Sequence, residues 1–119
     1  MTKYLFVAMG GALGAVLRFS VSNICSRTGQ PTGVATLIVN VVGSFCMALL
    51  LFKYGNKHIL QYFFTIGLLG AFTTFSTFSF EAVNMLRQLQ YLQAFLYVTL
   101  NFVLALLAVV SAFRLSLRL

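Results

Sequence analysis

Five hydroxyl side chains gather within seven positions of one apolar stretch, residues 67–81, which reads GLLGAFTTFSTFSFE. The hydroxyls and the phenylalanines interleaved with them are Thr73, Thr74, Ser76, Thr77, Ser79, Phe72, Phe75, Phe78 and Phe80. Gly67 and Gly70 precede the hydroxyls, where a helix could break and present bare backbone. Irregular backbone persists at membrane depth only where protein or a water-filled cavity covers it. We therefore predict that this stretch lines an ion pathway.

The chemistry available to these groups is the binding of a small anion. The polar groups inside the apolar runs are mostly neutral donors, and the single acid, Glu81, stands at the end of a run. A proton-coupled pump would want a carboxylate at membrane depth. Moving an ion into a low-dielectric interior costs on the order of 20 kcal/mol before compensation, so several donors must replace its water. Neutral donors can do this without trapping the ion, because conduction needs weak sites in series.

Two further groups of the stretch could take part. Phe72, Phe75 and Phe78 are three residues apart, and a ring edge carries partial positive charge, so their edges could line an anion path. The same spacing fits phenylalanines that only pack in the core or face lipid. A break near residues 70–73 would also free backbone carbonyls, which are good ligands for a hard cation.

Four apolar runs must position these groups: residues 4–21, 34–52, 59–80 and 92–113. Each is close to the 20 or so residues that cross a bilayer as a helix. The chain is 61% hydrophobic and 8% charged, whereas a soluble domain carries about a quarter charged residues. The connections are short, and no linker or second domain is visible. We predict one all-α transmembrane domain of four helices over residues 1–119, with the third helix broken near its middle.

Basic residues flank the runs and account for the net charge of +7. They form no patch with exposed aromatic residues, so a nucleic-acid partner is not expected. Four spans place both termini on one side, together with Lys3, Lys53, Lys57, Arg114 and Arg118, against Arg27, Arg87 and the span-end Arg18 on the other. The excess favours cytoplasmic termini. It is small, and insertion in both orientations stays open.

Each span also carries a stripe of small or polar residues at helical spacing. Gly10 and Gly14 form a small-x-x-x-small pair, which predicts close packing of two helices. Arg18, one turn on, fits either the lining of a vestibule or a structural hydrogen bond. The second span carries Thr36, Asn40, Ser44 and Ala48, and the fourth carries Tyr97, Asn101, Ala105 and Ala108. Asn40 fits both a bond between helices and a contact with an ion, since its amide must be satisfied in hydrocarbon.

Three stretches together resemble the Fluc/CrcB family of fluoride channels. They are GGALGAVLRF at 10–19, TLIVNVVGSF at 36–45 and GLLGAFTTFSTFSFE at 67–81, in the family's order and spacing. The resemblance extends over nearly the whole chain. Phe19 and Ala35 are mild departures, where the family often has tyrosine and glycine.

The resemblance implies a fluoride-specific channel of the bacterial plasma membrane, the cell inner membrane, that lets the ion leave the cytoplasm and so protects the cell from fluoride toxicity. It implies a dual-topology dimer, in which two antiparallel chains, identical or paralogous, enclose two pores within the lipid bilayer. Main-chain carbonyls of Gly70 and Thr73 would hold a structural Na+ ion that is not transported. Pore residues implied by the resemblance are Asn40, Phe75, Phe78, Ser76, Thr77, Tyr97 and Asn101, with Arg18 at the vestibule; Asn101 stands where a smaller hydroxyl residue is common.

Two other functions compete with this reading. A small four-helix exporter of lipophilic cations would need a carboxylate inside its first span and usually a tryptophan nearby, and this chain has neither. A non-conducting membrane scaffold would use the polar stripes only to join helices. An enzyme is not expected, because His58, Glu81, Cys25 and Cys46 do not supply a nucleophile, a base and an orienting group. The cysteines show neither a metal-ligand spacing nor a convincing disulfide pair.

Overall fold

The computed structural model describes residues 1–55 and 59–119, so Lys57 and His58 lie outside the described residues. The first two spans are α1, Thr2–Arg27, and α2, Val34–Tyr54. The third span, Tyr62–Arg87, is composed of the π-helical segment η1, Tyr62–Leu69, followed by α3, Gly70–Phe72, and α4, Ser76–Arg87. The fourth is α5, Tyr91–Ser116. All four spans are long and apolar enough to cross a membrane, which confirms the predicted all-α fold with four transmembrane helices.

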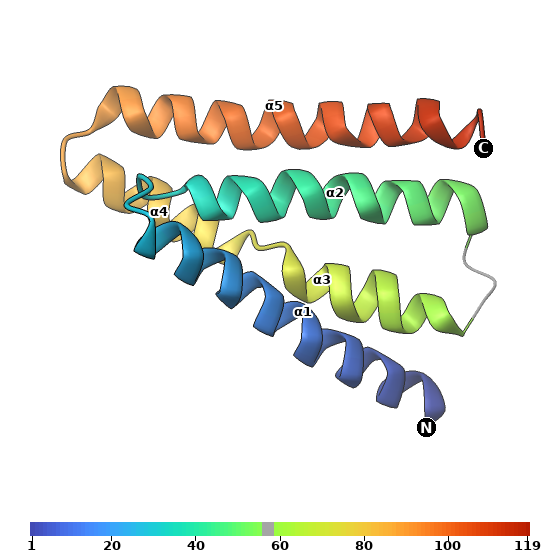
Figure 1. Ribbon diagram of the computed structural model, residues 1–119. Coiled ribbons are helices and arrows are strands. Elements are labelled where there is room, and N and C mark those ends of the chain that lie inside the picture. Colours follow the sequence, from blue (N-terminus) through green and yellow to red (C-terminus); the bar gives the residue numbers. More distant parts are fainter. Residues whose placement is uncertain (56–58) are drawn as a thin grey trace.

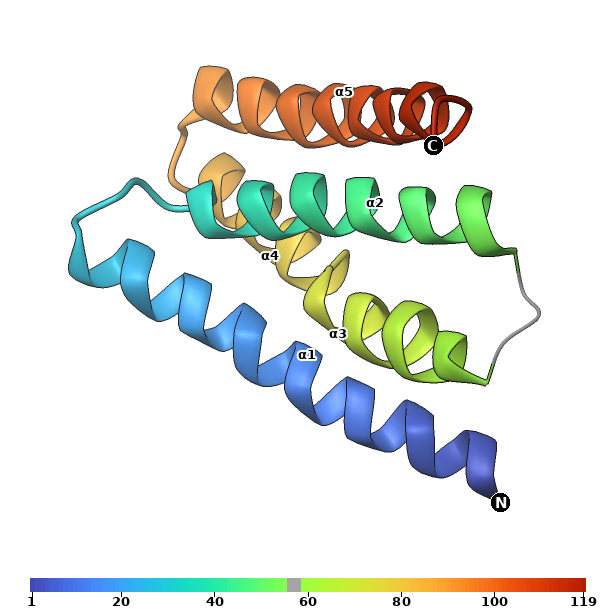
Figure 2. The same cartoon turned by 45° about the vertical axis from the view of Figure 1, so that its right-hand side comes forward.

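The four spans lie in one bundle, with both termini at the same end (Figure 1). α2 and α5 run side by side, and α1 crosses the third span at an angle, as both views show (Figure 2). The α1–α2 and α4–α5 connections lie at the opposite end of the bundle (Figure 1). Large apolar side chains on every span point outward, including Phe19, Phe64 and Phe102. A bundle that exposes so much apolar surface is suited to lipid rather than to water.

α1 meets η1 through glycines. A Cβ at Gly10 would overlap the carbonyl oxygen of Phe63, and a Cβ at Gly14 would overlap that of Leu68. From the other side, a Cβ at Gly67 would lie 2.7 Å from the carbonyl oxygen of Val7. The two backbones therefore touch, and the close packing predicted from the Gly10–Gly14 spacing is confirmed.

The backbone leaves helical geometry at residues 73–75, which we call the interruption. Thr73 is extended, with φ −79° and ψ 158°, and α4 starts at Ser76. The Thr73 side chain packs directly on Gly43 of α2, where an added Cβ would overlap its methyl group. The interruption is thus held against α2 in the middle of the third span.

The helices extend beyond the apolar runs at several ends. α1 continues through Arg27, and α4 continues through Asn84 to Arg87, where the sequence predicts a connection. Polar residues are compatible with a helix that reaches the interfacial region, so hydropathy alone underestimates its length. The α4 helix ends where Leu89 adopts a left-handed conformation, with φ 60°.

Candidate ion pathway

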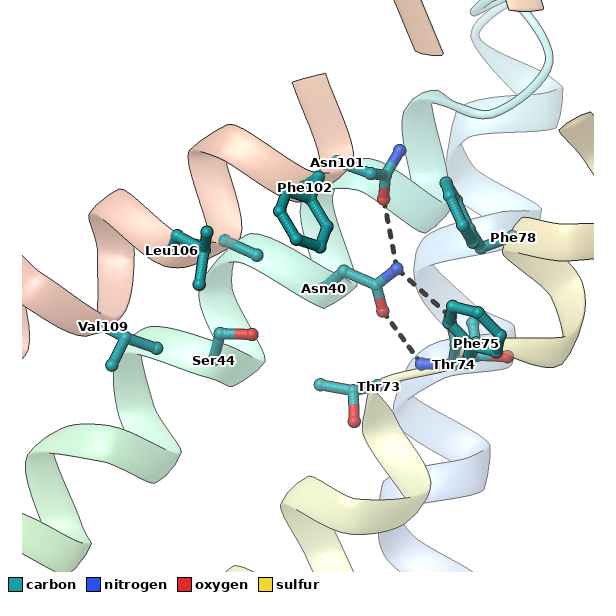
Figure 3. Close-up of a pocket in the computed structure, with 11 residues that line it drawn as sticks. Asn40, Ser44, Thr73, Thr74, Phe75, Phe78, Asn101, Phe102, Leu106 and Val109 are labelled. Carbon is teal, nitrogen blue, oxygen red and sulfur yellow. Dashed lines mark hydrogen bonds between the residues drawn. The ribbon is translucent and has the colours of Figure 1, made fainter. Parts of the chain in front are cut away.

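A pocket of about 390 Å³ lies beside the interruption, between α2, α4 and α5. It is lined by Asn40, Ser44, Thr73, Thr74, Phe75, Phe78, Asn101, Phe102, Ala105, Leu106 and Val109. None of these residues is ionisable. The polar stripes of the second and fourth spans face each other here, and four predicted pore residues share the pocket: Asn40, Phe75, Phe78 and Asn101 (Figure 3).

The side-chain amide of Asn40 forms two hydrogen bonds with the backbone of Thr74 beside the pocket (Figure 3). The Thr74 N–H donates to Asn40 Oδ1 at 2.9 Å, and Asn40 Nδ2 donates to the Thr74 carbonyl at 3.1 Å. Nδ2 also donates to Asn101 Oδ1 at 3.1 Å. A side-chain amide thus supplies the partners that a continuous helix would have supplied. Asn40 joins α2 to the third span and to α5, and its contact with an ion stays a prediction.

Thr74 is the most connected residue of the site, and it was predicted only as one hydroxyl of the stretch at 67–81, with no role of its own. Besides its two backbone bonds to Asn40, its Oγ1 accepts the Thr77 N–H at 3.2 Å and lies 3.3 Å from Ser76 Oγ. This hydroxyl therefore caps the first turn of α4. A threonine three residues before the first-turn N–H of a predicted helix is the sequence signal that indicates such a cap.

A chain of polar contacts continues from Asn101 along α5. Asn101 is 5% exposed, and its Nδ2 donates to the Tyr97 carbonyl at 3.1 Å. The Tyr97 hydroxyl donates to Glu81 Oε2 at 2.6 Å, which gives the only acid of the chain a partner on α5. Gly33, at φ 93°, receives the Tyr97 ring, because a Cβ there would lie 2.5 Å from the ring carbon Cε2.

Aromatic rings form a row beside the polar chain. The Phe75 and Phe78 centroids are 5.5 Å apart, and those of Phe78 and Tyr97 are 5.4 Å apart. Both ring pairs are tilted rather than stacked flat, at 42° and 36°. Phe78 is partly buried, whereas Phe75 is 78% exposed. The row therefore leads from the Tyr97 end of the bundle to an open edge of the pocket.

A second pocket, of about 260 Å³, lies between α1, α2 and α4. Arg18 lines it together with hydroxyl groups of Ser22, Thr36, Thr74 and Thr77. Thr74 lines both pockets and stands between them. The predicted residues are therefore distributed: Arg18 and Thr77 share the second pocket, Tyr97 adjoins the first through Asn101 and Phe78, and Ser76 contacts Thr74.

Comparison with known proteins identifies the chain. A family model described as CrcB-like protein, Camphor Resistance (CrcB), matches residues 5–113. The chain belongs to the CrcB family. A protein of Aeromonas salmonicida named fluoride-specific ion channel FluC is 39% identical over 120 aligned positions, which cover 97% of this chain and 96% of the relative.

Further relatives bear the same name. The Shewanella amazonensis protein is 45% identical over 115 positions, covering 92% of this chain and 91% of the relative. The Saccharophagus degradans protein is 44% identical over 117 positions, covering 95% and 88%. The CrcB match spans every predicted site residue, and the roles of the individual residues stay predictions.

Proposed function

We propose that this CrcB chain is a fluoride-specific ion channel that lowers cytoplasmic fluoride by passive permeation and so protects the cell. The carrying observation is the pocket beside the interruption, which offers amide, hydroxyl and ring-edge groups with no ionisable side chain in its lining. Such groups can replace the water of a small anion without holding it tightly. The names of the relatives point the same way. The activity is transport rather than catalysis, in the bacterial plasma membrane that the four spans cross.

The residues proposed to line the route are Arg18, Ser76, Thr77, Asn40, Asn101, Phe75, Phe78 and Tyr97. Arg18 and the hydroxyls beside it would receive the anion in the second pocket. From there the ion would pass Thr77 and Ser76, which lie on the first turn of α4. The row of Phe75, Phe78 and Tyr97 would guide it along ring edges. The polar contacts of Asn40 and Asn101 support their place beside this route.

Gly70 and Thr73 are proposed to hold a structural sodium ion through their carbonyl oxygens. In a helix these carbonyls would accept the N–H groups of Thr74 and Thr77. Both N–H groups are donated elsewhere, to Asn40 Oδ1 and to Thr74 Oγ1. Free carbonyl oxygens are suitable ligands for a hard cation such as sodium. The bound ion would supply a fixed positive charge beside the interruption.

We further propose an antiparallel dimer, of identical or paralogous chains, around the interrupted third span. Phe75 lines the pocket yet is 78% exposed, so one wall is incomplete in the single chain. Gly70 is exposed as well. Two carbonyls cannot replace the hydration shell of a cation, and a second copy related by two-fold symmetry would bring two more.

A liposome efflux assay tests the channel. Vesicles that contain the protein and are loaded with fluoride or chloride are monitored with ion-selective electrodes. We expect rapid loss of fluoride and retention of chloride. Fluoride traces that match those of empty vesicles would refute the channel and favour the non-conducting scaffold. Release of both ions would refute selectivity.

A further inference from the structure

We propose that Asn40 is a positioning residue for the cation site, because it takes the backbone N–H that would otherwise occupy the Gly70 carbonyl. The inference rests on the sodium site proposed above, and it assigns that site's formation to a side chain that binds no cation itself. It connects the anion route and the cation site through one amide group.

The two carbonyls proposed to bind sodium, those of Gly70 and Thr73, have both lost their helical hydrogen-bond donor in the same way. The Thr74 N–H, the helical partner of the Gly70 carbonyl, donates to Asn40 Oδ1 at 2.9 Å. The Thr77 N–H, the helical partner of the Thr73 carbonyl, donates to Thr74 Oγ1 at 3.2 Å. Each carbonyl is released because a side-chain oxygen has captured its donor. Without these oxygens, the N–H groups and any cation would compete for the same carbonyls.

Asn101 sets the direction of the Asn40 amide. Asn40 Nδ2 donates to Asn101 Oδ1, and Asn101 Nδ2 donates to the Tyr97 carbonyl. A half-turn of either amide would place donor against donor or acceptor against acceptor. The hydrogen-bond pattern therefore favours the orientation in which the Asn40 oxygen faces the Thr74 N–H. The cation site then depends on α2 and α5, although its two proposed ligands both belong to the third span.

Sodium-dependent thermal stability provides the test. The full-length protein in detergent is melted at increasing sodium, with N-methyl-D-glucamine replacing sodium at constant ionic strength. We expect the Tm of the wild type to rise with sodium. Asn40→Leu, which has similar volume and no oxygen, should need about fivefold more sodium for half of the stabilisation, as expected for one competing neutral hydrogen bond. Ser116→Ala, whose hydroxyl only donates to the Phe113 carbonyl of its own helix, is the control and should match the wild type.

Asn40→Asp separates positioning from anion contact. Its carboxylate still accepts the Thr74 N–H but loses the two bonds that Nδ2 donates, so the Tm without sodium should fall while the sodium response persists. The negative charge on the anion route should slow fluoride efflux. A role in packing alone predicts the reverse, since a buried charge would harm packing more than leucine does. An unchanged sodium response in Asn40→Leu, or a response lost in Asn40→Asp, overturns the inference.

Thr74→Val tests the other carbonyl and serves where Asn40→Leu fails to fold. It removes the oxygen that captures the Thr77 N–H while keeping the shape of the side chain. We expect a weaker sodium response, and an unchanged one overturns the inference. A wild type whose Tm ignores sodium removes the cation site together with this inference. The fluoride efflux of the wild type, measured separately, tests the proposed channel function independently of the cation site.

Discussion

The contact of α1 with η1 and the contact of α2 with the interruption join helices by opposite means. The first brings backbones together at Gly10, Gly14 and Gly67, with no room for a Cβ. The second holds its helices through the amide of Asn40, which reaches the Thr74 backbone. The Asn40 side chain acts as a spacer between α2 and the interruption, and a pocket of about 390 Å³ lies beside it.

The difference separates a tightly packed contact from the contact beside the proposed ion route. Glycine contacts provide dispersion over many atoms and leave no space for a hydrated path. Amide contacts form hydrogen bonds with polar backbone groups, which lipid cannot do. Such polar groups are costly to bury in a membrane, and they are useful where an ion needs polar neighbours. The α1–η1 contact should therefore govern folding, and the Asn40 contact should govern conduction.

Replacing Gly14 with valine should have the largest effect and should act on folding. The added atoms would overlap the Leu68 carbonyl, and overpacking costs about 1–3 kcal/mol even where neighbours can move, which a backbone cannot do freely. We expect little folded protein by size-exclusion chromatography. Gly11→Ala is the matched control, because a Cβ there meets nothing within 4 Å. If both variants fold equally well, the glycine contact is not what holds α1.

Asn40→Ala should leave the fold assembled and strongly reduce fluoride efflux. It removes the amide that orders the Thr74 backbone beside the proposed route. A barrier raised by about 1.4 kcal/mol slows a rate about tenfold, and we expect a loss of efflux of about this size. Asn101→Ala should reduce efflux less, since Thr74 keeps both bonds to Asn40. Initial rates from proteoliposomes give the ranking. The opposite ranking would mean that Asn101, rather than Asn40, dominates the route.

Phe75→Ile and Phe78→Ile should slow efflux while the purified protein keeps the elution volume of the wild type. Isoleucine keeps apolar volume but removes the ring edge, and an aromatic contact is worth about 0.5–1.5 kcal/mol, so a severalfold loss is expected. Efflux rates combined with the elution volume of the purified protein check both parts. Unchanged efflux would assign the two rings to packing.

Tyr97→Phe should have the smallest effect of the series. It removes the hydroxyl that donates to Glu81 and keeps the ring against Gly33 and Phe78. Tyr97 does not line the pocket beside the interruption, and one hydrogen bond is worth about 0.5 kcal/mol at the low end, so efflux should change by about twofold, with no loss of folded protein. A variant that fails to fold would show that this bond supports the bundle instead.

The sequence was sufficient to predict the four spans and the polar faces of the second and fourth spans that meet at the pocket. Hydropathy located four helices, and the Asn40 and Asn101 stripes predicted the two polar faces that line the pocket. The partner of Asn40 was beyond such reasoning, because a bond to the Thr74 backbone, 34 residues away, depends on how α2 lies against the third span. The π-helical winding of η1 was missed for a similar reason. It accompanies the close approach of α1, and the Gly10–Gly14 spacing predicts that approach but not the winding of the partner helix.

The interruption also has an electrostatic consequence. Aligned peptide dipoles leave roughly half a negative charge at the carboxyl end of a helix and half a positive charge at its amino end. The third span therefore has a carbonyl end at Phe72 and an amide end at Ser76 within a few residues of each other. Water at that depth is too scarce to screen them. A single short segment, bearing no ionised side chain, thereby offers opposite polarities to the anion and the cation proposed above.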